Sequence, residues 1–267
     1  MSLTDLLFAG APLAGEVVID AHCHMGPWSN FHIARDGSPA AMMELMDRLG
    51  IDASWICPHV GIGPDAARAN REAYQAAQDF PGRFYPYVIV NPNRGRAAAE
   101  AEIAHWVARG GIRAFKLHPG THQYKATGEA YGPVFEYADA HRLPVLIHSW
   151  NGDRLGGPPI LAELARTYPN AKILIAHSAT NWQMLEEASE ACLACENIFL
   201  DIAGSGLHAG LLEEMVRRVS AERILFGTDS PFLDPRPQVG RVLLARITDD
   251  EKRLIFGLNA RRVFGMG

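Results

Sequence analysis

Short apolar runs rich in β-branched and aromatic residues alternate with amphipathic segments along the whole chain. Runs of the first kind predict buried strands, and apolar positions spaced three and four residues apart predict helices. We predict eight strands, over residues 16–24, 53–59, 84–92, 112–119, 144–149, 172–178, 197–204 and 223–232. Helices are predicted between the strands and after the last one, over residues 38–50, 64–80, 96–111, 132–142, 158–168, 181–192, 209–220, 237–247 and 249–264.

The strict alternation of strands and helices predicts parallel strands with helical crossovers. Eight repeats in 267 residues have the count and length of a closed (β/α)8 barrel. We therefore expect one α/β TIM-barrel domain over residues 1–267, with eight parallel strands inside and the helices outside. An open doubly wound sheet is the alternative, and it usually carries a glycine-rich phosphate loop after its first strand. His22 and His24 occupy that place here, which favours the barrel.

The first predicted strand stands out because polar side chains follow its apolar start. In an extended strand successive side chains alternate between faces. This alternation places Asp20, His22 and His24 on one face, and Ala21 and Cys23 on the other. The two imidazoles are either hydrogen-bonded histidines near a strand end or a pair of metal ligands, and a metal site requires further ligands from other strands.

Ionisable side chains recur at the predicted strand ends. In closed barrels of this type the active site lies at the carboxyl ends of the strands. Seven of the eight predicted strands finish on such groups, which are His22 and His24, His59, Lys116 and His118, His148, His177, Asp201, and Asp229. A buried imidazole needs hydrogen-bond partners, so structural histidines are not expected to gather in this way. The pattern indicates a functional site at this end of the barrel.

A metal site explains why these residue types occur together. A catalytic zinc ion keeps three or four nitrogen and oxygen ligands, leaves a position for water, and lowers the pKa of that water to about 7. His22, His24, His148 and Asp229 offer such a set from the first, fifth and eighth strands. Asp229 would also take the proton of the water, unless it only caps the following helix. His177 would be a further ligand or a proton donor.

Composition and charge exclude several other classes of protein. The formal net charge of -5 and the pI near 6.1 argue against a surface that binds nucleic acid or an anionic membrane. No run of roughly 18 apolar residues predicts a membrane-spanning helix. Four cysteines and a start without a basic leader predict a reduced, cytoplasmic protein. We expect a small-molecule substrate as its partner, and exposed loop aromatics leave a homodimer open.

Six motifs occur in the order IDAHCH, FKLHP, VLIHS, ILIAHS, ILFGTDSPF and IFGLNARRVFG, and together they span nearly the whole chain. In this order and at these strand ends they resemble the amidohydrolase superfamily. The resemblance is closer to its amidohydrolase-related (type 2) branch of metal-dependent TIM-barrel hydrolases and decarboxylases. It implies a metal at His22, His24, His148 and Asp229, with His177 touching the bound water or a second ion.

The resemblance also bears on the number of ions and on the substrate contacts. Many type 2 relatives use one zinc, whereas relatives with two metals usually bridge them through a carboxylated lysine at the fourth strand, where Lys116 lies. We favour one zinc ion, for which Mn²⁺ or Fe²⁺ could substitute because N/O sites select weakly among first-row ions. Lys116 is then expected to bind a substrate anion. His118 and His59 are predicted to contact substrate or to make structural hydrogen bonds, and Asp201 to orient a ligand or to bind backbone donors.

The loops after the first and fifth strands carry aromatic residues. Trp28 and Phe31 in the first loop, with Trp150 and Asn151 in the fifth, are expected to line a pocket or to pack as a lid.

Three functions are compatible with this set of residues. The main hypothesis is hydrolysis of an amide or lactone, in which the metal polarises the carbonyl, Asp229 moves the proton and His177 stabilises the oxyanion. The alternative is zinc-dependent nonoxidative decarboxylation of an aromatic or enol carboxylic acid. A non-catalytic metal-binding barrel is the third, and it is disfavoured because the stability of the barrel requires no metal at that end.

Overall fold

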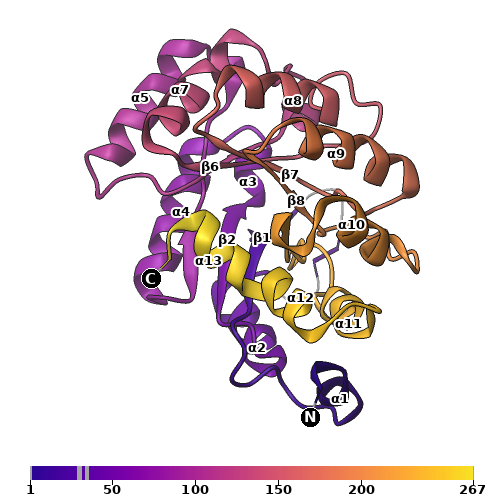
Figure 1. The fold of residues 1–267 in the computed structure, drawn as a ribbon. Helices are drawn as coiled ribbons and strands as arrows, with labels where there is room; N and C mark the ends of the chain where they lie inside the picture. Colours follow the sequence, from indigo (N-terminus) through magenta and orange to yellow (C-terminus); the bar gives the residue numbers. More distant parts are fainter. Residues whose placement is uncertain (1, 29–31, 34–35, 267) are drawn as a thin grey trace.

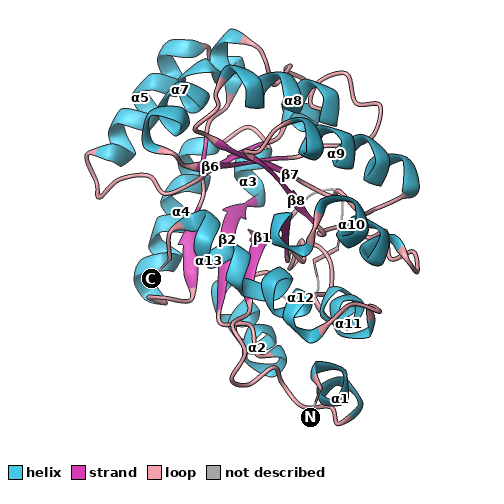
Figure 2. Ribbon diagram, in the orientation of Figure 1, coloured by secondary structure: helices cyan, strands magenta, loops and turns pink. Residues whose placement is uncertain are grey.

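The computed structural model describes residues 2–28, 32–33 and 36–266, in which short strands alternate with helices (Figure 1, Figure 2). The strands are β1 (Ile19–Met25), β2 (Ala53–Pro58), β3 (Phe84–Pro86), β4 (Val88–Ile89), β5 (Phe115–Leu117), β6 (Pro144–Ile147), β7 (Lys172–Ile175), β8 (Ile198–Asp201) and β9 (Ile224–Leu225). The helices are α1 (Leu3–Phe8), α2 (Pro39–Leu49), α3 (His59–Ile62), α4 (Ala66–Asp79), η1 (Pro92–Arg94), α5 (Arg96–Val107), α6 (Pro119–His122), η2 (Glu129–Tyr131), α7 (Gly132–His141), α8 (Pro158–Thr167), α9 (Trp182–Ala194), α10 (Leu211–Val219), η3 (Ala221–Arg223), α11 (Arg236–Leu244), α12 (Asp249–Arg253), η4 (Leu254–Leu258) and α13 (Asn259–Phe264). Within the described residues no helix combines the length and the hydropathy that crossing a membrane requires.

All strands run parallel and pair in chain order, β1 to β3 in one sheet and β4 to β9 in another. Isolated backbone hydrogen bonds, rather than a continuous ladder, join the two sheets. The Tyr87 N–H, in the break between β3 and β4, donates to the Ile56 carbonyl at 3.0 Å, and the Ala21 N–H donates to the Phe226 carbonyl at 2.9 Å. The predicted TIM-barrel order is therefore confirmed, with the predicted strand 84–92 divided into two pieces.

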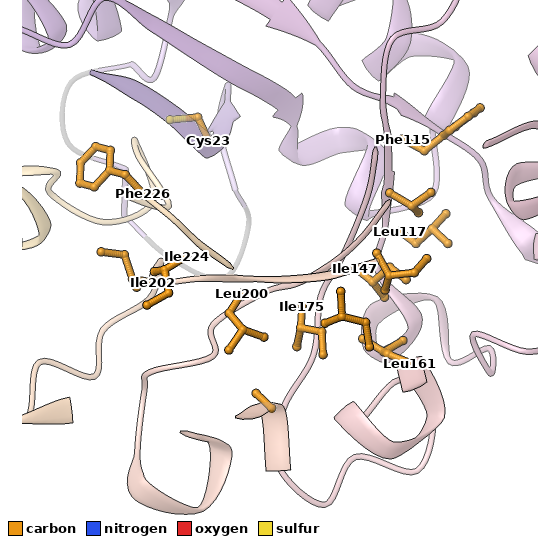
Figure 3. Close-up of a cluster of buried hydrophobic side chains, with 14 of the residues drawn as sticks. Cys23, Phe115, Leu117, Ile147, Leu161, Ile175, Leu200, Ile202, Ile224 and Phe226 are labelled. Carbon is orange, nitrogen blue, oxygen red and sulfur yellow. The ribbon is translucent and has the colours of Figure 1, made fainter. Parts of the chain in front are cut away.

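Both faces of the strands are buried, as is usual for parallel sheets. One apolar cluster fills the barrel interior and includes Ile19, Ala21, Trp55, Tyr87, Leu146, Leu174 and Leu225. A second cluster lies between the strands and the surrounding helices and includes Phe115, Leu117, Ile147, Leu161, Ile175, Leu200 and Phe226 (Figure 3). The interior is thus a packed core, and the polar side chains described below lie at one end of it.

Strand β1 departs from the regular alternation that the sequence pattern predicts. Its pairing with β2 shifts register between Asp20 and Cys23, which is a β-bulge. As a result Ala21 belongs to the interior cluster, whereas Asp20 Oδ2 accepts a hydrogen bond from Cys23 Sγ at 2.8 Å. The prediction that Asp20 shares a face with His22 and His24 is wrong, because the bulge re-aims the side chains. The two imidazoles still face each other, with ring centroids 5.3 Å apart.

Several strands are shorter than predicted, and the polar residues lie just beyond their ends. His59 is the first residue of α3, His118 precedes α6, and His148 and His177 lie in the loops after β6 and β7. The backbone of His177 and of Asp229 has a positive φ, 61° and 65° respectively. Such values are uncommon outside glycine and end a strand abruptly. Backbone strain of this kind is characteristic of functional sites.

Candidate metal centre

Asp229 lies among three imidazoles at the carboxyl end of the barrel. Its Oδ1 is 3.4 Å from His22 Nε2 and 3.1 Å from His24 Nε2, and its Oδ2 is 4.0 Å from His177 Nδ1. All four side chains are buried. One ligand atom each from His22, His177 and Asp229 lies within 4.8 Å of the others, close enough to share one ion. The structure thus brings together residues from the first, sixth and eighth predicted strands.

Asp201, at the end of β8, orients the ring of His22 through a hydrogen bond. Its Oδ2 accepts a hydrogen bond from His22 Nδ1 at 2.8 Å, so the proton lies on Nδ1 and the lone pair on Nε2. Its Oδ1 accepts from the backbone N–H groups of His177, at 3.1 Å, and Ala203, at 2.8 Å. Asp201 therefore orients one candidate ligand and binds backbone donors, which are the two alternatives that the sequence left open.

Lys116 points inward from β5 and is 1% exposed. Its Nζ lies 2.7 Å from His22 Nε2, so the ammonium donates to the lone pair that a metal would use. Burial lowers the pKa of Lys116. Lys116 is not among the residues that line the cavity described below. The prediction that Lys116 binds a substrate anion is neither supported nor contradicted by this position.

The protonation states of the centre suit metal ligands, which must be neutral imidazoles and ionised carboxylates. Burial, together with the charge of Lys116, lowers the pKa of His22 to about 4, so its imidazole is neutral near pH 7. Burial alone would raise the pKa of Asp229, but the neighbouring His177, His22 and His24 hold it well below its ordinary value. Nitrogen and oxygen donors of this kind fit a divalent first-row ion.

His148 adjoins this group through His177 rather than through Asp229. Its Nδ1 lies 3.0 Å from His177 Nε2, and its ring stacks on that of His118 with centroids 3.8 Å apart. Burial lowers the pKa of both His148 and His118 well below the ordinary value. The assignment of His148 as a ligand stays a prediction, because His177 is the imidazole that groups with His22 and Asp229.

A cavity of about 160 Å³ opens above the centre, and it is lined by His24, Trp28, His59, Ile62, His118, His148, His177, Asp229 and Phe232. The predicted substrate-contacting residues His59 and His118 both lie in its wall, and their contact with substrate stays a prediction. Ile62 and Phe232 were not predicted. Phe232 follows the TDS motif by two residues in the eighth βα loop, which was the one signal that pointed to it.

The predicted aromatic lining is found in part. Trp28 lies in the wall of the cavity, 5.3 Å from the His59 ring. Phe31 lies outside the described residues. Trp150 is 42% exposed and is not part of the wall, and Asn151 Oδ1 accepts a hydrogen bond from Asn181 Nδ2 at 2.9 Å. The fifth loop therefore packs against α9 and the residue before it, while the Trp150 ring lies 6.1 Å from that of His177 in the cavity wall.

Comparison with known proteins gives one family and one fold. The chain matches the family model described as Amidohydrolase over residues 19–266. No curated protein matches its sequence.

Three of the similar solved structures carry the names of enzymes. 5-Carboxyvanillate decarboxylase from Novosphingobium aromaticivorans, in complex with manganese and 4-hydroxy-3-methoxy-5-nitrobenzoic acid, is 17% identical, with a TM-score of 0.73 over 94% of this chain and 97% of that one. 2,6-Dihydroxybenzoate decarboxylase from Rhizobium is 17% identical, with a TM-score of 0.69 over 94% and 99%. 4-Oxalomesaconate hydratase from Rhodopseudomonas palustris is 18% identical, with a TM-score of 0.66 over 93% and 96%. At these identities the likeness concerns the fold.

Proposed function

This chain belongs to the amidohydrolase family, and from that premise we propose that it is a metal-dependent carboxy-lyase. It would release carbon dioxide from a small aromatic or enol carboxylic acid. This was the alternative that the sequence left beside hydrolysis of an amide or lactone. Two observations favour it. The fold is shared with two decarboxylases whose names specify aromatic acids, and planar aromatic side chains line the cavity.

The cavity carries the proposal because several planar rings line it together with the Asp229 carboxylate. Trp28 and His59 are neighbours with ring centroids 5.3 Å apart, and the stacked pair of His118 and His148 also lines the cavity. Such walls fit a flat ring better than a tetrahedral or extended substrate. The volume of about 160 Å³ also restricts the substrate to a small molecule.

His22, His24 and Asp229 would hold the ion, with His177 or His148 completing the set. A bound divalent cation supplies positive charge that neutralises the substrate carboxylate and draws electron density from the breaking bond. Asp201 keeps His22 Nε2 available through the 2.8 Å hydrogen bond at Nδ1. We favour one zinc ion, and Mn²⁺ or Fe²⁺ also suit these donors.

Loss of carbon dioxide leaves an electron pair on carbon, which must take up one proton. We assign that transfer to Asp229, which lines the cavity and, being ionised at rest, would first take one proton from water and then give it to the carbon. His177 would support that transfer from its Nε2, which lies 3.0 Å from His148 Nδ1. Its Nδ1 donates to the Ala203 carbonyl at 3.2 Å and is 4.0 Å from Asp229 Oδ2, which is too far for a direct hydrogen bond. Lys116 beside His22, with His59 and His118 in the wall, would orient the substrate. Asp229 and His177 are thus the proposed catalytic residues.

A substrate screen tests the proposal. Zinc-loaded and metal-stripped protein would be incubated with hydroxybenzoates and with amide, lactone and ester panels. We expect carbon dioxide release from an aromatic acid by the loaded protein alone, with deuterium from D₂O at the vacated carbon. Hydrolysis of an amide or lactone without carbon dioxide would restore the hydrolase hypothesis. Metal binding without any turnover would favour a non-catalytic barrel.

We further propose a cytoplasmic protein whose partner is its small-molecule substrate. The net charge of -5 supports the absence of a nucleic-acid partner. Light scattering after size-exclusion chromatography would decide whether it forms a homodimer, and loss of the protein from the soluble fraction of a cell lysate would contradict the location.

A further inference from the structure

One ring nitrogen of His59 makes a hydrogen bond within the protein, and this bond determines whether the other nitrogen donates or accepts. The Nδ1 atom lies 2.8 Å from the backbone carbonyl oxygen of Gly26. A carbonyl oxygen only accepts hydrogen bonds, so Nδ1 must carry the hydrogen. In the neutral ring the lone pair is then on Nε2, which makes that atom a hydrogen-bond acceptor.

This acceptor is buried and has no partner within the described residues. His59 is 2% exposed, and its Nε2 makes no hydrogen bond to the described part of the chain. Five other buried side-chain atoms among the described residues also have no partner, on Trp55, Ser149, Ser189, Gln238 and Arg241, but His59 is the one of the six residues that lines the cavity. Buried acceptors are rarely left unpaired in native proteins, so a partner from outside the chain is expected. Since His59 lines the cavity, a molecule in the cavity is the nearest outside partner, and the wall must shift slightly for the two to meet because Nε2 itself exposes almost no surface.

The neighbours of His59 hold its ring in place. The ring stacks on His24 with centroids 4.8 Å apart and an interplanar angle of 25°. Trp28 and Phe232 pack against it, with centroids 5.3 Å and 6.3 Å away. Because these rings and the bond to Gly26 restrict rotation, the acceptor is presented in one direction.

We propose that His59 determines specificity by accepting a hydrogen bond from a hydroxyl or N–H group on the substrate ring. This inference rests on the proposed function and narrows its substrate class to ring acids that carry a donor besides the carboxylate. A ring substituted only with acceptors or apolar groups leaves Nε2 unpaired and binds less tightly. His59 acts as a binding residue, without a part in the proton transfer.

Matched ligands test the inference on the zinc-loaded full chain. Calorimetry would compare each hydroxybenzoate isomer with its fluorobenzoate counterpart, which lacks the donor without adding bulk. We expect at least one hydroxyl isomer to bind about tenfold or more tightly than its counterpart. His59→Phe should abolish that preference and keep the zinc content of the wild type. Ile62→Val, which trims the same wall without removing a polar atom, should change both affinities alike.

Three outcomes would contradict the role of His59, and a fourth would contradict the proposed function instead. A preference that survives in His59→Phe overturns the inference, because the metal or another residue then recognises the hydroxyl. Loss of zinc in His59→Phe also overturns it, since His59 would be a ligand. If that variant fails to fold, the wild type alone tests the inference. It is overturned if the wild type binds no hydroxybenzoate more tightly than its fluorobenzoate counterpart. Carbon dioxide release is measured on the same samples, so a wild type that binds with the preference but never decarboxylates contradicts the proposed function alone.

Discussion

His22 donates from Nδ1 to Asp201 Oδ2 across 2.8 Å, and this contact places the His22 lone pair at Nε2, opposite Asp229. Residues that hold a metal ligand in this way typically change metal affinity or activity by about 10- to 100-fold when mutated. We therefore expect Asp201→Asn to weaken zinc binding by that factor, measured by competition with a chromophoric chelator. Glu214→Gln, which removes a carboxylate on α10, is the control and should keep wild-type affinity. Equal affinities for Asp201→Asn and the wild type would show that the contact is only structural.

Lys116 competes with a metal for the same lone pair, since its Nζ lies 2.7 Å from His22 Nε2. Removing the cation in Lys116→Met should raise zinc affinity about tenfold or more, because a like charge next to the ion is lost. Titration with elemental analysis would give both affinity and stoichiometry. A variant that binds fewer ions than the wild type would contradict this prediction and would favour a carboxylated Lys116 that bridges two ions.

Tyr87 ties the break between β3 and β4 to the bulge in β1. Its buried hydroxyl donates to the carbonyl oxygen of Ala21 at 2.6 Å, one residue before His22. Tyr87→Phe leaves that buried carbonyl without its side-chain donor, and we expect the free energy of unfolding to fall by about 1–3 kcal/mol. Urea denaturation of the metal-free protein measures it. An unchanged midpoint and slope would mean that the bulge does not depend on this bond.

Glu214 provides a pH test away from the centre. Hydrogen bonds from Arg217 and Arg218, each 2.7 Å long, lower the pKa of Glu214 from 4.5 to about 2. Because the folded pKa lies below the unfolded one, the stabilisation is complete above about pH 4.5 and is lost as the pH falls towards about 2. The melting temperature of the wild type should therefore exceed that of Glu214→Gln at pH 7, with a gap that narrows below pH 5. A gap that stays constant from pH 7 to pH 3 would refute this.

The sequence predicted the barrel and the gathering of histidines for a physical reason. Parallel strands bring their carboxyl ends to one face, so His22 and Asp229 meet although 207 positions of chain separate them. The face of Asp20 was not predictable, because a bulge changes parity without a sequence signal of its own. The pairing of Lys116 with His22 and the closeness of His177 to Asp229 also depend on side-chain directions beyond the strand ends, where alternation no longer applies.

The residues of the cavity wall were the hardest part of the site to predict from the sequence. Ile62 comes from the short helix α3 and Phe232 from the loop after β9, and neither carries a polar atom that marks function. His59 was noticed for its place at a strand end. Its tautomer depends on the Gly26 carbonyl, which only the folded backbone brings to 2.8 Å.

Crystals soaked in zinc and measured at the zinc absorption edge test the central claim most directly. The account predicts one anomalous peak bonded to His22 Nε2, His24 Nε2 and an oxygen of Asp229, with bond lengths of about 2.0–2.2 Å. The same map would show whether His177 or His148 completes the set. A peak elsewhere on the protein, with His22 still bound to Lys116 and no density beside Asp229, would contradict the account.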